Sequence, residues 1–170
     1  MRILITGGSG SVGKAIIERL VRRGDRVRVI GRRSGLSFAG AEYRVCDVTD
    51  FPSLREAVRD CEVIVHLAAL ANPGDGTAEE VYLINTLGSF HVFQAAAEEG
   101  IRRVIQASSI NAAGQFFGVK HAPLHYLPLD EEHPVFSTDA YSFPKNIVDA
   151  TAQYFWRREG ISTISLRYLW

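Results

Sequence analysis

The sequence has little cysteine, no excess charge of either sign and no long hydrophobic run. Basic and acidic residues number 19 each, so no net field favours nucleic acid or an anionic membrane surface as a partner. Cys46 and Cys61 lack metal-ligand spacing, and two such thiols are expected to stay reduced. The apolar run after Met1 and Arg2 is too short for a signal sequence or a membrane span. We therefore expect a cytoplasmic protein that binds neither nucleic acid nor membrane.

Short apolar runs instead alternate with longer helical patterns along the chain. Its 170 residues are enough for one core and too few for two ordinary domains, so we expect a single domain over residues 1–170. The alternation is typical of βαβ units stacked around a parallel sheet. The predicted strands are 3–6, 26–30, 42–45, 63–67, 104–108 and 163–166.

Three segments have apolar residues at helical spacing. They lie between the first two strands, around residues 81–95, and from Tyr141 to Phe155. The last two should flank the fifth strand. Residues 111–138 contain three prolines and little periodicity, and irregular loops of this length are usually functional or mobile. We interpret this segment as a lid or substrate loop.

Four glycines lie within seven positions after the first strand, in the segment Thr6-Gly-Gly-Ser-Gly-Ser-Val-Gly13. A glycine-rich turn that follows a strand and opens a helix can hold a dinucleotide pyrophosphate at the positive end of the helix. Gly7 would permit the tight turn, Gly10 would let backbone amides reach the phosphates, and Gly13 would let the helix approach the strand. The alternative, a flexible turn, needs only one or two glycines.

The order of further motifs resembles the extended short-chain dehydrogenase/reductase family, which contains sugar-nucleotide epimerases and dehydratases. The matching segments are the glycine motif, Asp47-Val48, His66-Leu-Ala-Ala69, Asn85, Ser108-Ser109 and Tyr141-Ser-Phe-Pro-Lys145. The resemblance covers the whole chain. It implies an α/β fold of the Rossmann type: a doubly wound parallel sheet in three layers, with strand order 3-2-1-4-5-6.

The cofactor implied is NADP or NAD. Where an NAD enzyme usually has an acidic residue after the second strand, this chain has Gly31-Arg32-Arg33, and a guanidinium can pair with a 2′-phosphate. We therefore favour NADP, although six arginines between Arg22 and Arg33 could simply form a solvated basic turn. The expected cofactor-binding residues are Gly7, Gly10, Ser11, Val12, Gly13, Arg32, Arg33, Asp47, Val48, Leu67, Ala68, Ala69, Asn85 and Lys145.

Two of these assignments have a structural alternative. Asp47 resembles the family's adenine contact, but an aspartate that closes a strand can also cap the following short helix. Asn85 resembles the asparagine near the nicotinamide, but an amide in a helix can also bind a local backbone group.

Tyr141, Lys145 and Ser109 are the expected catalytic residues. Tyr141 and Lys145 are four residues apart and share one face of a helix. By resemblance, Tyr141 exchanges the proton of a substrate hydroxyl, Lys145 lowers the tyrosine pKa and holds the nicotinamide ribose, and Ser109 binds the substrate oxygen. Without the surrounding motifs, a tyrosine and lysine at this spacing would be an ordinary surface pair.

The chain also departs from the family pattern. Ile110 and Asn111 replace the Asp-Glu pair of the dehydratases, which argues against dehydration. Pro144 fits a helix only if the helix starts near Tyr141 or bends. We interpret His66 as structural. We expect no metal site, because Pro123 disfavours the helix that would align the histidines of the loop.

These observations lead to three hypotheses. The first is an oxidoreductase or epimerase that moves hydride to or from a carbinol carbon of a sugar or sugar nucleotide. The second is a truncated NAD(P)-binding module that senses redox state or needs a partner, since the family's C-terminal substrate region would lie beyond Trp170. The third is a reductase of a non-sugar carbonyl. By resemblance, we also expect a homodimer through the helices of Asn85 and Tyr141, with Tyr154 and Trp156 in the contact.

Overall fold

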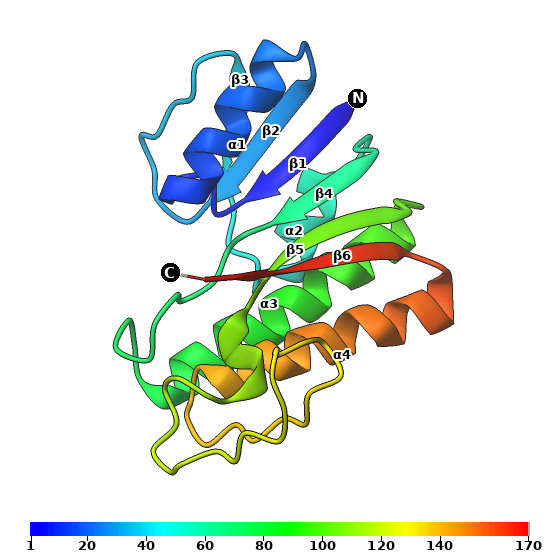
Figure 1. The fold of residues 1–170 in the computed structure, drawn as a ribbon. Helices are drawn as coiled ribbons and strands as arrows, with labels where there is room; N and C mark the ends of the chain where they lie inside the picture. The colour runs from blue at the N-terminus through cyan, green and yellow to red at the C-terminus, as the bar shows by residue number, and fades with distance from the viewer. Residues whose placement is uncertain (170) are drawn as a thin grey trace.

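The computed structural model describes residues 1–169, so Trp170 lies outside the described residues. Six parallel strands form one sheet in the order β3-β2-β1-β4-β5-β6, which confirms the predicted Rossmann-type topology. The order reverses direction between β1 and β4, where both strands lie side by side in the centre of the sheet (Figure 1). The strands are β1 (Arg2–Thr6), β2 (Arg26–Gly31), β3 (Ala41–Val45), β4 (Val63–His66), β5 (Arg103–Ser109) and β6 (Ser162–Tyr168).

Four α-helices cover the two faces of the sheet, and each face has its own core. On one face, α1 (Ser11–Arg22) packs its Ile17 against valines and isoleucines of β1, β2 and β4. On the other face, α2 (Phe51–Val58), α3 (Ala78–Glu98) and α4 (Ser142–Glu159) share a larger core that includes the fully buried Phe93 and Phe155. The three layers predicted from the sequence are therefore present.

Local signals in the sequence fix where the helices start. Thr77 and Glu80 form a capping box at the start of α3, each side chain accepting from the other's backbone N–H. Asp139 accepts hydrogen bonds from the N–H groups of Tyr141 (2.9 Å) and Ser142 (2.7 Å) before α4. Pro144 therefore falls in the first turn of α4, where its missing N–H costs no intrahelical bond.

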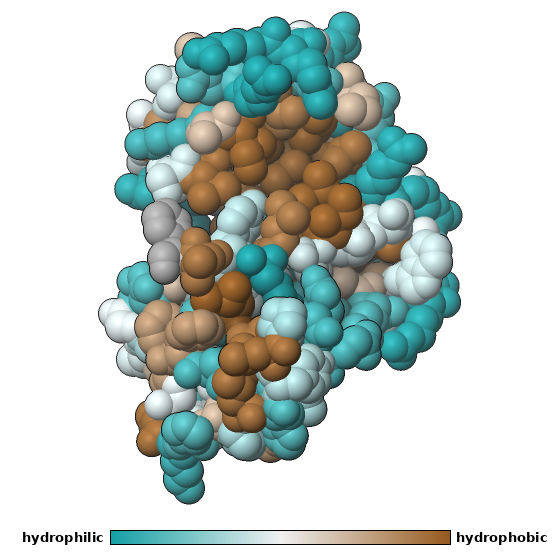
Figure 2. All heavy atoms as spheres, in the orientation of Figure 1, coloured by the Kyte–Doolittle hydropathy of each residue, from teal (hydrophilic) through white to brown (hydrophobic). Residues whose placement is uncertain are grey.

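The face of the sheet that α1 covers is open near β5 and β6. In the described residues, α1 is the only α-helix on this face, and Ile164 and Leu166 of β6 are exposed. Figure 2 shows hydrophobic residues gathered across the middle of the face in view. Within residues 1–169, none of the helices combines the length and the hydropathy needed to cross a membrane.

The segment between β5 and α4 is irregular, as expected from its prolines. A short 3-10 helix, η1 (Ile110–Ala113), follows β5, and no α-helix or strand occurs from there to α4. The two ends of the segment come together where Phe136 N–H donates to the Ala113 carbonyl (3.2 Å). A methyl group on Gly114 would lie 2.5 Å from the Phe136 carbonyl carbon, so only glycine permits this crossing.

Candidate active site

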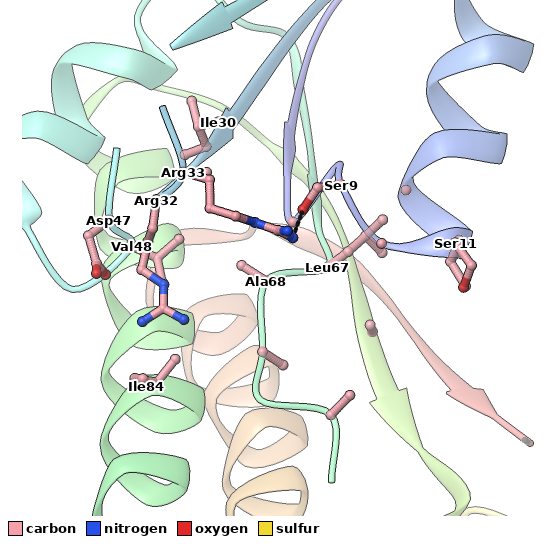
Figure 3. Close-up of a pocket in the computed structure, with 18 of the residues that line it drawn as sticks. Ser9, Ser11, Ile30, Arg32, Arg33, Asp47, Val48, Leu67, Ala68 and Ile84 are labelled. Atoms are coloured by element: carbon pink, nitrogen blue, oxygen red, sulfur yellow. Dashed lines mark hydrogen bonds between the residues drawn. The ribbon is translucent and has the colours of Figure 1, made fainter. Parts of the chain in front are cut away.

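A cavity of about 690 Å³ opens at the carboxyl ends of the strands, where the strand order reverses. In open α/β sheets this crevice is where ligands bind. Figure 3 shows that its wall combines the loop before α1, the turn after β2, the segment after β4 and the side of α3. Every predicted site residue except Asn85 lines this cavity.

The glycines of the loop before α1 are needed at their positions for different structural reasons. Gly7 has a positive φ of 70°, and a methyl group on it would lie 2.7 Å from the backbone nitrogen of Ala68. A methyl group on Gly13 would lie 2.7 Å from the Gly7 carbonyl oxygen, and one on Gly8 would strike Val29 at 2.4 Å. Gly10 has no comparable conflict, with only the Gly7 oxygen at 3.6 Å. Protein packing therefore explains three of the glycines, and the space beside Gly10 opens into the cavity.

The two arginines after β2 point to different places. The Arg33 guanidinium donates to Ser9 Oγ (2.9 Å) in the glycine loop, whereas Arg32 lies between Val48 and Ile84 beside α3 (Figure 3). The Tyr43 hydroxyl holds this turn by sharing its one proton between the carbonyls of Arg33 (2.5 Å) and Gly31 (3.1 Å). Two cationic side chains thus face the cavity near Ser9 and α3.

Not all of the six arginines between Arg22 and Arg33 lie in a solvated turn. Arg28 is buried in β2, and its guanidinium donates to the carbonyls of Ala57 (2.7 Å) and Arg59 (3.0 Å) and to Glu42 (2.9 Å). This arginine ties the C-terminal end of α2 to the sheet.

Asp47 does not cap α2. Its carboxylate accepts from the N–H (2.9 Å) and hydroxyl (2.8 Å) of Thr49, while Asp50 is the residue that caps the helix by accepting from Ser53. Asp47 and Val48 face the cavity at the end of β3. Of the two interpretations offered for Asp47, capping of the short helix is wrong.

A buried hydrogen-bond chain fixes the segment after β4. Thr6 Oγ1 accepts from the N–H groups of Leu67 (3.1 Å) and Ala68 (3.0 Å), so its hydroxyl proton goes to His66 Nδ1 (2.8 Å). The other ring nitrogen of His66 then donates to Ser89 on α3 (3.0 Å). Burial lowers the pKa of His66 to about 3, so the ring is neutral and its role is structural.

Asn85 clamps the same segment from α3. Its amide accepts from Leu70 N–H (2.9 Å) and donates to the Leu70 carbonyl (3.0 Å), and the residue is almost fully buried. Both polar atoms are thus occupied by the backbone, and Asn85 lies outside the cavity wall. This geometry corresponds to the local backbone role that the sequence left open for Asn85.

Tyr141, Lys145 and Ser109 converge at one end of the cavity. Lys145 Nζ donates to the Ala107 carbonyl (2.9 Å) and lies 5.7 Å from the centroid of the Tyr141 ring. Burial lowers the pKa of Lys145 to about 8. Burial also raises the pKa of Tyr141, and the polar Ser109 side chain acts in the opposite direction. The three residues come from the end of β5 and the first turns of α4.

The cavity fits a dinucleotide cofactor in shape and polarity. The start of α1 has backbone N–H groups free for an anion, Gly10 leaves room beside them, and the Arg33 guanidinium lies beside the loop. The sequence reasoning missed Ser9, which Arg33 contacts, and Tyr168, which lines the cavity from β6. Ser9 could have been found from its place among the loop glycines.

His125 and His133, in the segment before α4, contact one another and the backbone. His133 is buried and accepts from His125 N–H (3.1 Å), and the His125 ring stacks on Phe136. In residues 1–169, no group of three or more potential metal-binding side chains has the arrangement of a metal site. These histidines stabilise the fold of the segment.

Comparison with known proteins gives consistent matches. A family model described as the NAD dependent epimerase/dehydratase family matches residues 3–169. The chain is 33% identical over 67% of its length to sterol demethylase protein B of Methylococcus capsulatus, covering 36% of that protein. It is 31% identical over 99% of its length to an L-arabinose 1-dehydrogenase (NAD(P)(+)) of Haloferax volcanii, covering 66% of it.

The solved structures agree with these matches. A UDP-galactose 4-epimerase structure is 26% identical with a TM-score of 0.83, over 99% of this chain and 55% of that one. The chain thus spans between about a third and two thirds of the length of the proteins named here.

Proposed function

Because the chain belongs to the NAD-dependent epimerase/dehydratase family, we propose that it is the dinucleotide-binding domain of an NAD(P)-dependent oxidoreductase or epimerase. The proposed substrate carries a carbinol carbon on a sugar or a sugar nucleotide. The convergence of Tyr141, Lys145 and Ser109 on the cavity is the observation that carries this proposal. Relatives that act on L-arabinose and on UDP-galactose support the substrate class.

In the proposed reaction, Tyr141 takes the proton of the substrate hydroxyl during oxidation and returns a proton during reduction. A bound nicotinamide would accept or supply the hydride. Lys145 places a positive charge beside the Tyr141 ring, which favours the phenolate, and its ammonium would hold a ribose hydroxyl of the bound cofactor. Ser109 donates a hydrogen bond to the reacting oxygen.

The proposed cofactor is NADP in preference to NAD. Arg33 and Ser9 form a pair at the place where the adenosine ribose would lie, next to the glycine loop. A guanidinium and a hydroxyl together offer several donors to a 2′-phosphate. Arg32 would cover the adenine, which Asp47 and Val48 would contact from β3.

The proposal is tested with Tyr141→Phe. The purified protein is titrated calorimetrically with NADP and NAD, and turnover is measured with L-arabinose, D-glucuronate, UDP-glucose and UDP-galactose. We expect the variant to bind cofactor with unchanged affinity and to lose turnover by a factor of at least about 100. Turnover equal to that of the unmodified protein would exclude the Tyr-Lys-Ser mechanism.

A reductase of a non-sugar carbonyl is a second candidate. The similarity to sterol demethylase protein B and the exposed apolar side chains of the segment before α4, such as Phe116, Val119 and Leu127, favour it. The same residues would do the chemistry, and only the substrate pocket would differ. Turnover of steroid ketones with NADPH, without turnover of the four sugars, would select this candidate.

We also propose a homodimer through α3 and α4. Two exposed aromatic pairs bridge these helices, with Tyr82 stacked on Phe143 (5.7 Å between ring centroids) and Phe90 on Tyr154 (6.5 Å). Trp156 does not join this row, because it follows Tyr154 by two residues, which corresponds to a rotation of about 200° around the helix axis.

A cytoplasmic location is proposed from the two free, buried cysteines, which would stay reduced there.

A further inference from the structure

Asn111 is hydrogen-bonded to Ser109 and has no role in the proposed mechanism described above. It lies in η1, two residues after Ser109, and both residues are buried. Its backbone N–H donates to Ser109 Oγ (3.1 Å), and its side-chain amide nitrogen donates to the same oxygen (3.2 Å). One serine oxygen therefore accepts two hydrogen bonds from a single neighbour.

The hydrogen-bonding capacity of a hydroxyl makes this arrangement informative. A serine oxygen has two lone pairs and one proton, so two N–H donors occupy both of its acceptor sites. The hydroxyl proton is then available only for donation to a third group. Ser109 faces the cavity with Tyr141, so the remaining hydroxyl proton is directed into the space that the two residues share.

The other end of the Asn111 side chain, its Oδ1 atom, is buried and has no hydrogen-bond partner within the described residues. Among these residues, the side-chain amide is therefore held through Nδ2 alone, by its contact with Ser109. The backbone adds a constraint, because Gly114 N–H donates to the Asn111 carbonyl (2.8 Å) and closes η1 around it.

We propose that Asn111 is a positioning residue that commits the Ser109 hydroxyl to donating, toward Tyr141 in the free protein and toward the substrate oxygen in the complex. The proposal rests on the proposed function for its catalytic meaning. An aspartate at this position would accept the Ser109 proton instead and withdraw it from Tyr141. An alanine would leave only the backbone donor and loosen the hydroxyl.

The groups around Tyr141 set the expected direction of the effect. Asp75 and Asp139 raise the tyrosine pKa by their negative charge, Lys145 lies beside the ring, and Ser109 opposes the carboxylates. Loss of the donated hydrogen bond therefore raises the Tyr141 titration midpoint. In oxidation, where the phenolate is the base, the ascending limb of the pH profile moves to higher pH by the same amount.

The test titrates Tyr141 directly and needs no substrate. The protein is labelled with tyrosine carrying carbon-13 at Cζ, Tyr141→Phe assigns the signal, and Tyr43 and Tyr168 serve as internal references. We expect Asn111→Asp to raise the Tyr141 midpoint by about one pH unit or more and Asn111→Ala to raise it less. In a Ser109→Ala background, Asn111→Ala should have no further effect, because no hydroxyl remains to be oriented.

Two results would overturn the proposal. One is an unchanged Tyr141 midpoint in both variants at position 111. The other is an equal effect of Asn111→Ala with and without the Ser109 hydroxyl, which would assign Asn111 a purely structural role. If Asn111→Asp fails to fold, the cycle with Asn111→Ala decides alone. Failure of the proposed function appears separately, as full turnover of Tyr141→Phe.

Discussion

Arg32 and Arg33 are adjacent in the sequence, yet their side chains leave the turn after β2 in different directions. Arg33 reaches Ser9 in the glycine loop, and Arg32 lies beside α3. Arg33→Ala should therefore raise the dissociation constant for NADP about tenfold or more and leave that for NAD nearly unchanged. Arg32→Ala, the matched control, should weaken both cofactors to a similar extent. Calorimetric titration of the two variants measures this, and an equal loss for NADP and NAD in Arg33→Ala would contradict it.

Lys145 combines a buried position with a charge, so the folding free energy depends on its protonation. Its pKa falls from 10.5 to about 8 in the folded state, so between these values the unfolded chain holds the extra proton. The free energy of unfolding therefore rises with pH in this window, by up to about 3 kcal/mol. Below pH 8 the full cost of burying the ammonium is present.

Lys145→Met removes this cost at every pH. We expect urea unfolding of the unmodified protein to show a gain in stability between pH 8 and 10.5 relative to Lys145→Met. The difference between the two proteins cancels the titration of the tyrosines other than Tyr141, which lies beside Lys145. A constant difference across this range would show that the lysine keeps its ordinary pKa.

At the residue scale, the sequence reasoning succeeded where a residue type has one use and failed where it has several. Gly7 and Gly13 are determined by close backbone contacts that no other residue allows, and their motif is readable. The buried role of Arg28 was not predicted, because a strand arginine looks the same in sequence whether it is solvated or hydrogen-bonded to carbonyls. The clamp of Asn85 on Leu70 likewise depends on a contact made only after folding.

Helix α4 depends on one side chain at its start. Asp139 accepts from two backbone N–H groups, including that of Tyr141, so it fixes both the helix end and the proposed catalytic tyrosine. Asp139→Ala should lower the free energy of unfolding by about 1 kcal/mol, measured in urea. Asp139→Asn keeps an oxygen acceptor and should retain most of that stability. Equal losses in the two variants would mean that the charge rather than the cap matters.

Helix α1 depends on how closely it approaches β1. A methyl group at position 13 would lie 2.7 Å from two backbone atoms of the preceding loop, which cannot move without opening the turn. Gly13→Ala should therefore abolish cofactor binding in a calorimetric titration and lower the thermal midpoint. Gly10→Ala, which meets only one atom at 3.6 Å, should fold normally and affect binding alone. A Gly13→Ala protein that binds cofactor normally would contradict this account.

The elements themselves were the most predictable part of the structure. All six strands and three of the helices lie where the periodicity indicated, with ends that differ by a few residues. The apolar spacing within α1, α3 and α4 explains this success. The 3-10 helix after β5 has only four residues and no periodic signal, and its contact with Ser109 could not be predicted because it forms only after folding.

For the whole molecule, the aromatic row on α3 and α4 predicts the oligomeric state. Tyr82→Glu places a charge in the exposed row and should convert the proposed dimer to a monomer in sedimentation velocity. Trp156→Glu is the matched control, because Trp156 is exposed on another side of α4. A dimer that tolerates Tyr82→Glu but not Trp156→Glu would place the interface elsewhere.

The crossing of Gly114 and Phe136 has a consequence for protein engineering. The two ends of the segment meet at this point, held by the hydrogen bond from Phe136 N–H to the Ala113 carbonyl. Ser109 lies before the crossing, and Tyr141 and Lys145 lie after it. Residues 115–135 also contact the chain beyond the crossing, because the Phe117 ring packs edge-on against Tyr141 (5.7 Å between centroids) and the Lys120 backbone is hydrogen-bonded to Thr138. A segment from a relative with another specificity could be spliced in at this point if it keeps these two contacts, so that the reaction centre keeps its geometry.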